Sequence, residues 1–449
     1  MKKLWETNGK LDGFVAEYTV GGDAALDVKF LKYEVLGSLA HAASLVRIGL
    51  LKRGEFQAIQ TELKKLLANE KFTVRPEQED IHTAVEQALT ESLGETGKRI
   101  HAGRSRNDQV QTNLRLYMKD GLLKIHAAAC SAAQAWLGFA EAQQTTLMPG
   151  YTHLQRAMPT TVGHWAASHA EALLEGLGAL ESAFAEADAS PLGSAAGFGV
   201  PLPLDRPYTA GLMGFSRVQR NTLRVQSSRP RIEAAAVSAL TLLARDLGVL
   251  AGDISLFTTA EFAFFKLGED FTTGSSIMPQ KRNPDLVELT RAKAALFPGW
   301  LSQILAIGQL PSGYHRDYQL SKAPLCAAFE TAAGMLEAVR RLPESLQVDT
   351  ARCKAAVTRE MTATQKALEA VRGGVPFREA YQTVAEKMRG ASAASCDADE
   401  ISLPEYPGAP GNPGFAEIAA AISLRRKWSE ERIRDLDAAW DALLRLDVS

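Results

Sequence analysis

Apolar residues recur at helical spacing through long stretches of the chain that contain no proline. Three such stretches cover residues 77–148, 160–190 and 231–278. In the last one, apolar residues follow each other at steps of four and three, the spacing of a helical bundle: Ile232, Ala236, Leu240, Leu243, Leu247, Leu250, Ile254 and Phe257. This pattern predicts a long helix within a bundle.

Other faces of the same predicted helix are apolar as well, at Val237, Leu242, Val249 and Leu256. A helix that is apolar on several sides has to be covered on several sides, either by its own fold or by partner subunits. The stretch 107–148 has a similar character. Even ~36 helical residues would span about 54 Å at 1.5 Å per residue, which is longer than a small domain is wide.

Strand patterns are scarce, and KFTVRP (71–76) is the best short candidate. EYPGAPGNPGF (405–415) has the composition of an extended linker, with a final helix predicted after it. We therefore predict an all-α fold with a central bundle of long helices. The predicted domains are residues 1–104, 105–348 and 349–449.

Amino-acid composition excludes several classes of protein and of binding partner. The 50 Lys and Arg residues nearly balance 52 Asp and Glu residues, for a formal charge of −2, which gives no reason to expect nucleic acid or an anionic membrane as partner. The four cysteines are widely spaced and predict reduced thiols, not a zinc site or a disulfide framework. The N-terminus has no apolar signal region, and the uncharged run 294–315 is interrupted by polar residues and prolines. We expect a cytoplasmic protein without a membrane span.

Clusters of polar residues interrupt the helical pattern in four segments. KRIHAGRSRNDQ (98–109) contains three arginines, whose planar guanidinium groups match carboxylates or phosphates. PGYTHLQRAMPTTVGH (149–164) places His153 beside Thr152 in a loop bounded by glycine and proline. Histidine is well suited to proton transfer near neutral pH. The alternatives are a solvated basic turn for the first segment and a structural histidine for the second.

The third segment is GSSIMPQKRNPD (274–285), and its end predicts a helix start with Asn283 as N-cap. A Gly-Ser-Ser segment can move and carry a hydroxyl to a substrate, and Lys281 could supply an electropositive field for a serine base. The fourth, LPSGYHRDYQLSK (310–322), offers Tyr314, Gln319 and Lys322 as donors. The alternative for both is a solvated surface loop.

Motifs of several common chemistries are absent from the sequence: GxGxxG, GxxxxGK, HExxH and GxSxG do not occur. Nothing therefore indicates a dinucleotide, a P-loop nucleotide, a zinc protease or a nucleophile-elbow hydrolase. The remaining groups are anion-binding donors, one histidine and one loop serine. That set suits acid–base chemistry on a di- or tricarboxylate without a cofactor or a metal.

Three of these segments resemble the argininosuccinate lyases of the fumarase/aspartase superfamily. GSSIMPQKRNPD is similar to the superfamily's signature loop, while HAGRSRNDQ and GYTHLQRAMP resemble the argininosuccinate branch. The similarity extends from EDIH (79–82) through PLGS (191–194) to GVPFREAYQTV (374–384). The resemblance implies a three-domain α-helical fold and a homotetramer. Each active site would then be built from segments of three subunits, including part of the N-terminal domain.

The resemblance also implies the reaction and the residues that perform it. The family cleaves argininosuccinate reversibly to arginine and fumarate without a cofactor. By resemblance, Ser275 is the base, His153 its partner in proton transfer, and Lys281 and Asn283 hold the carboxylate on which charge accumulates. The implied substrate-binding residues are Arg106, Asn107, Thr152, Tyr314, Gln319, Lys322 and Arg229.

The match has departures on the arginine side of the substrate. Where the family usually has a serine in its N-terminal substrate loop, the chain reads TVGGDAALD (19–27), so Ala24 would leave that contact to its neighbours. RVQSSRPR (224–231) replaces the family's Asp-Ala-Val-Ser-Asp-Arg-Asp stretch and retains Arg229 of its ligand donors. His315 and Tyr318 stand where Asn and Leu are common.

Two alternatives are considered, the first because segment 224–231 is altered and the second because the family includes recruited lens proteins. One is an elimination enzyme of the same superfamily that acts on another succinyl adduct. The other is a non-catalytic structural protein on the same scaffold. Retention of Ser275, His153 and Lys281 together argues against the second.

Overall fold

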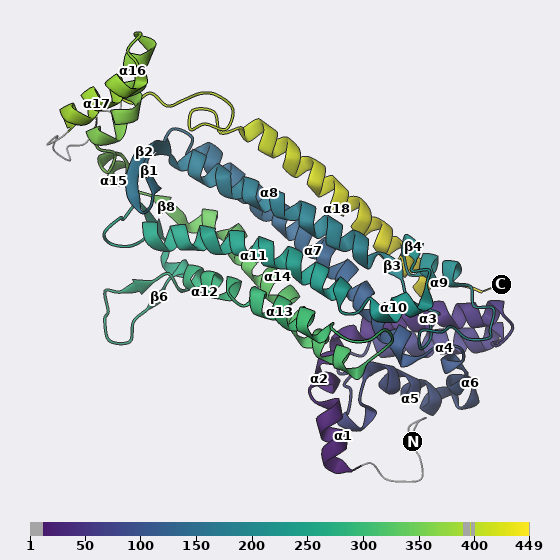
Figure 1. Ribbon diagram of the computed structural model, residues 1–449. Coiled ribbons are helices and arrows are strands. Elements are labelled where there is room, and N and C mark those ends of the chain that lie inside the picture. Colours follow the sequence, from purple (N-terminus) through teal and green to yellow (C-terminus); the bar gives the residue numbers. More distant parts are fainter. Residues whose placement is uncertain (1–11, 389–395, 397–399, 449) are drawn as a thin grey trace.

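The computed structural model describes residues 12–388, 396 and 400–448. At its centre five long helices lie side by side in Figure 1: α7 (Arg106–Ala142), α8 (Val162–Ala187), α11 (Arg231–Phe257), α14 (Lys322–Ser345) and α18 (Phe415–Leu444). Helix α7 packs against α8, α14 and α18, and α11 packs against α8 and α14. The predicted all-α fold with a central bundle of long helices is confirmed.

The start of α7 follows from its local sequence. Ser105 is the N-cap: its hydroxyl accepts the Asn107 amide at 3.3 Å, and the Asp108 carboxylate accepts the Ser105 amide at 2.9 Å. From there the helix runs for 37 residues, about 55 Å at ~1.5 Å per residue. Consecutive buried residues such as Leu122 and Leu123 show that neighbouring helices cover it on more than one side.

Helix α11 buries the predicted apolar seam from Ile232 to Phe257. Val237 is buried by the same fold, whereas the side chains of Leu242 and Val249 are 53% and 46% exposed. By length and composition alone, the stretch Thr222–Phe257 could cross a membrane, but 56% of its most apolar window is buried inside the bundle. It has the burial expected of a core helix, and its outer face is partly exposed in the single chain.

Shorter helices gather at one end of the bundle (Figure 1). They are α1 (Gly13–Val20), α2 (Asp23–Asp27), η1 (Val28–Phe30), α3 (Leu31–Arg47), α4 (Arg53–Leu67), η2 (Pro76–Gln78), α5 (Ile81–Leu93), α6 (Glu95–Lys98) and η3 (Arg99–His101). The predicted strand at 71–76 is wrong, because residues 72–75 are irregular and η2 begins at Pro76. A strand needs a partner for its backbone groups, and no described strand pairs with this segment.

The described strands form two-stranded pairs between the helices. They are β1 (Leu147–Thr152) with β2 (Gln155–Thr161), β3 (Ala189–Ser190) with β4 (Arg217–Val218), β5 (Phe265–Leu267) with β8 (Leu346–Val348), and β6 (Thr273–Gly274) with β7 (Arg282–Asn283). Only the β3–β4 pair is parallel among these. The segment 149–164, expected as a loop, is therefore mostly a β-hairpin. Figure 1 shows this hairpin and β6 at the end of the bundle opposite α1, α2 and α5.

The remaining helices connect these parts. They are α9 (Arg206–Leu212), α10 (Thr222–Ser227), η4 (Glu269–Phe271), α12 (Asp285–Ala294), α13 (Phe297–Ile307), η5 (Arg316–Ser321), α15 (Thr350–Ala355), η6 (Arg359–Thr362), α16 (Ala363–Arg372) and α17 (Phe377–Met388). Asn283 is not the N-cap of α12; Pro284 holds that position, and the Asn283 amide donates instead to the Gly274 carbonyl at 3.4 Å. The final helix α18 begins after the predicted linker and lies along α7 and α8. The domain boundaries at 104 and 348 stay predictions.

Candidate active site

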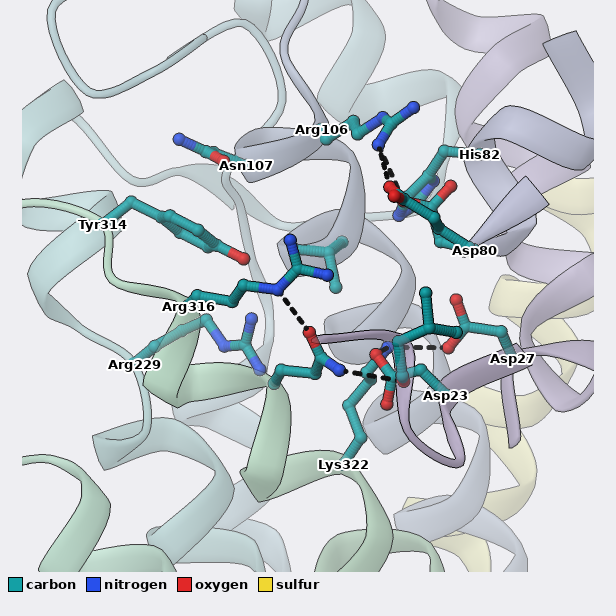
Figure 2. A pocket seen from close by; sticks show the side chains of 14 residues that line it. Asp23, Asp27, Asp80, His82, Arg106, Asn107, Arg229, Tyr314, Arg316 and Lys322 are labelled. Atoms are coloured by element: carbon teal, nitrogen blue, oxygen red, sulfur yellow. Dashed lines mark hydrogen bonds and ion pairs between the residues drawn. The ribbon is translucent and has the colours of Figure 1, made fainter. Parts of the chain in front are cut away.

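A polar cavity of about 380 Å³ lies at the end of the bundle that holds the N-terminal helices. Six residues predicted to bind substrate line it together: Arg106, Asn107, Arg229, Tyr314, Gln319 and Lys322. The segments that carry them are far apart in the sequence and meet because α7, α11 and α14 all begin at this end (Figure 1). Figure 2 shows the side chains around the cavity. Further lining residues were not predicted from the sequence: Asp23, Asp27, Glu79, Asp80, His82 and Arg316.

Lys322, the first residue of α14, forms a buried ion pair with two carboxylates of α2. Its Nζ lies 2.5 Å from Asp23 Oδ2 and 2.7 Å from Asp27 Oδ1 (Figure 2). Burial alone would lower the pKa of Lys322, but the charges of Asp27 and Asp23 outweigh it and raise that pKa. Lys322 is therefore a fully charged ammonium group at neutral pH.

Arg106, the first residue of α7, is held by two further carboxylates. Its Nη1 lies 3.2 Å from Glu79 and 3.4 Å from Asp80, while Nη2 donates to Thr83 Oγ1 at 2.6 Å. The neighbouring Asn107 side chain forms no hydrogen bond with any residue in the described ranges and extends to the cavity in Figure 2. Arg106 is thus oriented by acids, and Asn107 is available to a ligand.

Arg229 approaches the cavity from the other side. Its Nε lies 2.8 Å from Glu233, and its Nη2 donates to the Tyr318 carbonyl at 2.8 Å and to Ser321 Oγ at 2.9 Å. The remaining nitrogen, Nη1, is buried and has no hydrogen-bond partner in the part of the chain that the structure describes. A buried donor left in this state is a natural position for a ligand oxygen.

The segment 314–319 completes this wall of the cavity. Gln319 Nε2 donates to the backbone carbonyls of Thr19 and Val20 at 3.1 and 3.2 Å, and Arg316 donates to Thr19 O at 2.8 Å. These bonds tie the segment to the C-terminus of α1. Tyr314 extends its hydroxyl toward the Arg316 guanidinium in Figure 2.

Beneath the cavity, His82 forms a buried ion pair with Glu34 of α3. His82 Nδ1 lies 2.6 Å from Glu34 Oε2, and the same carboxylate accepts hydrogen bonds from Asn113 at 2.9 Å and Gln109 at 3.1 Å. Burial opposes both charges, but the interaction with His82 lowers the pKa of Glu34 to about 2, and Glu34 raises the pKa of His82. His82 belongs to the EDIH segment, whereas no sequence signal connected it with Glu34.

The predicted catalytic residues do not line this cavity. His153 and Thr152 lie in the exposed β1–β2 hairpin, and Ser275, Lys281 and Asn283 lie in or beside the β6–β7 loop. Both segments are at the opposite end of the bundle (Figure 1). Within one chain, the predicted catalytic residues therefore lie at one end of the bundle together with Thr152 and Asn283. The other predicted substrate-binding residues lie at the opposite end.

The two distant segments have unusual local structures. His153 and Leu154 form the two-residue turn of the hairpin with φ of 55° and 58°, a geometry usually given to Asn and Gly. The Ser275 hydroxyl accepts the backbone amides of Met278 at 3.1 Å and Ile277 at 3.4 Å. Donors aimed at a serine oxygen favour its alkoxide form, as a serine base requires.

Comparisons with known proteins identify the family of the chain. The family described as "Lyase" matches residues 7–299, and "Argininosuccinate lyase C-terminal" matches residues 360–426. Argininosuccinate lyase of Sorangium cellulosum is 44% identical over 94% of this chain and 98% of its own. The enzymes of Xylella fastidiosa and Thermotoga neapolitana are 42% and 41% identical over 95% and 86% of this chain, and 95% and 98% of their own. The chain belongs to the argininosuccinate lyase family.

Solved structures show the same fold. EDDS lyase in complex with formate is 24% identical, with a TM-score of 0.82 over 98% of this chain and 97% of its own. A fumarate lyase from Mesorhizobium is 20% identical, with a TM-score of 0.65 over 98% and 99% of the two chains. These similarities show that the chain shares the fold of these lyases.

The departures from the family pattern can now be placed. Ala24 is buried and does not line the cavity, but its neighbour Asp23 does, so this segment contributes a carboxylate. Segment 224–231 keeps Arg229 at the cavity and buries Gln226, whose side chain donates to the Ala195 carbonyl at 3.0 Å. Tyr318 is buried against Arg229, with its ring centre 5.8 Å from the guanidinium carbon. Among the described residues, no cluster of His, Cys, Asp or Glu could hold a metal ion.

Proposed function

We propose that this member of the argininosuccinate lyase family cleaves argininosuccinate reversibly to L-arginine and fumarate. The observation that carries the proposal is the cavity in which six predicted substrate-binding residues meet. It combines arginine, asparagine, tyrosine and glutamine donors with the carboxylates of Asp23 and Asp80. A substrate with several carboxylates and a cationic amino-acid end requires both kinds of group. The identity of 40–44% to curated argininosuccinate lyases over most of the chain supports the same reaction.

In the proposed mechanism, Ser275 removes the proton from the carbon next to a succinyl carboxylate. The amides of Ile277 and Met278 stabilise the serine alkoxide. As the carbon loses its proton, negative charge moves onto the carboxylate, which Lys281 and Asn283 hold. The bond between carbon and the guanidino nitrogen then breaks, fumarate forms, and the nitrogen takes up a proton with the help of His153. No step uses a cofactor.

This mechanism requires segments from different subunits, and we propose a homotetramer in the cytoplasm. The hairpin and the β6–β7 loop of one chain would reach the cavity of another. The exposed apolar side chains at these tips support this assembly, because Leu154 is 75% and Ile277 is 82% exposed in the single chain. Leu242 and Val249 on α11 provide a further uncovered apolar face.

Fumarate formation tests the proposed function directly. Purified protein is mixed with argininosuccinate or with adenylosuccinate, and the ultraviolet absorbance of fumarate is followed. We expect turnover with argininosuccinate alone. Turnover only with adenylosuccinate would indicate a lyase for another succinyl adduct, and turnover with neither would support a non-catalytic role for the scaffold.

A further inference from the structure

The cavity contains two carboxylates for one ammonium group at the N-terminus of α14. Asp23 and Asp27 both contact Lys322 Nζ, so the three side chains together carry one surplus negative charge. The ammonium of Lys322 is buried and already shared between two acids. This arrangement is poorly suited to binding a substrate carboxylate, although the resemblance implies that Lys322 is a substrate-binding residue. It is suited to binding a cation.

Asp23 and Asp27 differ in whether a carboxylate oxygen is free to accept a further hydrogen bond. Asp27 is 3% exposed, and its second oxygen accepts the backbone amide of Ile81 at 3.1 Å, so both of its oxygens are engaged. Asp23 is 16% exposed and uses Oδ2 for Lys322. No residue in the described part of the chain donates a hydrogen bond to Asp23 Oδ1, and Asp23 lines the cavity. Asp23 therefore holds the available negative charge.

Positive groups lie on the neighbouring wall of the same cavity. Arg316 lines it and forms no ion pair with the residues that the structure describes, and Arg229 Nη1 is buried without a partner. Arg316 Nε and Nη2 already donate to Gln319 and Thr19, so Nη1 is the Arg316 nitrogen left for a ligand. One cavity thus offers a carboxylate oxygen and guanidinium nitrogens that have no partner among the described residues. An α-amino acid has the complementary pattern, since its ammonium and carboxylate groups are bonded to one carbon.

We propose that Asp23 is a specificity-determining residue, whose free carboxylate oxygen accepts a hydrogen bond from the α-ammonium group of the substrate's arginine half. Arg316 and Arg229 face the α-carboxylate, and Asp27 keeps Lys322 in place. The inference rests on the proposed function. It also gives the departure in segment 19–27 a consequence: the carboxylate of Asp23, next to Ala24, binds the ammonium group in the segment where the family usually has a serine.

The reverse reaction, in which arginine adds to fumarate, allows analogues of arginine to test this proposal. Fumarate consumption is measured with arginine, with 5-guanidinovalerate, which lacks the amino group, and with agmatine, which lacks the carboxylate. For Asp23→Asn we expect kcat/KM with arginine and with agmatine to fall roughly 10- to 100-fold, as for the loss of one charge-assisted hydrogen bond. The value with 5-guanidinovalerate should change by less than about threefold, because no ammonium group is present to lose that bond.

Two matched variants separate recognition from structure. Asp23→Glu keeps the charge and should retain most of the preference for arginine over 5-guanidinovalerate. Asp27→Asn removes the buried acid and should lower both kcat/KM values together, along with the melting temperature. An equal loss for both acceptors in folded Asp23→Asn would overturn the inference while the proposed function stands. No fumarate consumption by the unaltered protein with arginine would overturn the proposed function, and the inference with it.

Discussion

Arg106 and His153 lie at opposite ends of the same helix. Arg106 is the first residue of α7 and lines the cavity, while His153 lies in the hairpin that follows the other end of that helix. The 37 residues of α7 separate them by about 55 Å at ~1.5 Å per residue. Within one chain the two side chains cannot act on one substrate. If both serve the same site, they come from different subunits.

Mixed assemblies test this separation. Arg106→Met and His153→Asn should each be nearly inactive alone. When the two variants are unfolded together and refolded, some sites in the mixed tetramers receive both native residues, and part of the activity should return. Turnover is measured by fumarate absorbance, and assembly by light scattering.

The control is a mixture of His153→Asn with His153→Gln, in which no site can receive a native histidine. It should regain nothing. A fully active monomer in light scattering would contradict shared sites.

Ser275 should be essential for the chemical step. For Ser275→Ala we expect turnover to drop at least ~10³-fold with little change in substrate affinity, because proton abstraction is an interaction of the transition state. The adjacent Ser276 is exposed and offers a matched control, since Ser276→Ala should remain close to wild type. Near-normal turnover of Ser275→Ala in a stopped-flow or steady-state assay would remove Ser275 from the role of base.

The bundle could be predicted from the sequence because its signal is local. The seam of α11 and the length of α7 follow from spacing and from the absence of proline. The strands could not be predicted in the same way. Strands β5 and β8 come from distant segments, and the β1–β2 hairpin turns at His153 and Leu154 without the usual Asn-Gly signal. The β1–β2 hairpin was expected as a loop, and segment 71–76 was expected as a strand without any partner to pair with.

Only part of the candidate site could be predicted from the sequence, for a similar reason. Motifs identified donors such as Arg106 and Lys322, but not the acids that hold them. Asp27 and Lys322 are 295 residues apart, and their contact exists only because α2 packs against the start of α14. Glu34 and His82 meet in the same way between α3 and α5. Pairing between distant helices carries no sequence signal in a single chain.

The Glu34–His82 pair should make stability depend on pH in both directions. The pKa of Glu34 is lowered to about 2, so its contribution is complete above its ordinary range and is lost as the pH falls toward 2. The pKa of His82 is raised, so its contribution is complete below its ordinary range and is lost as the pH rises through the folded-state value. Removing one partner of a buried pair costs about 3–5 kcal/mol, which we expect for Glu34→Ala.

Chemical unfolding of wild type and Glu34→Ala across pH measures this contribution. Glu337 is a suitable control, because its ion pair with Arg340 lies on the surface. Glu337→Ala should change the free energy of unfolding by less than about 1 kcal/mol, as is usual for exposed pairs. An unchanged stability of Glu34→Ala at neutral pH would contradict the buried pair.

Variants of Lys281 test whether the β6–β7 loop is catalytic or only a solvated surface loop. Lys281 is exposed at the end of the β6–β7 loop, directly before β7, and forms no ion pair among the described residues, so Lys281→Met should shift the melting temperature by only a few degrees. If its ammonium group faces the carboxylate that gathers charge in a partner's cavity, turnover should fall roughly 10²–10³-fold, as for the loss of an oxyanion donor. Lys281→Arg should restore only part of the activity, because a planar guanidinium does not replace a compact ammonium. Lys293→Met on α12 is the matched exposed control and should remain active; full activity of Lys281→Met as well would return the loop to a structural role.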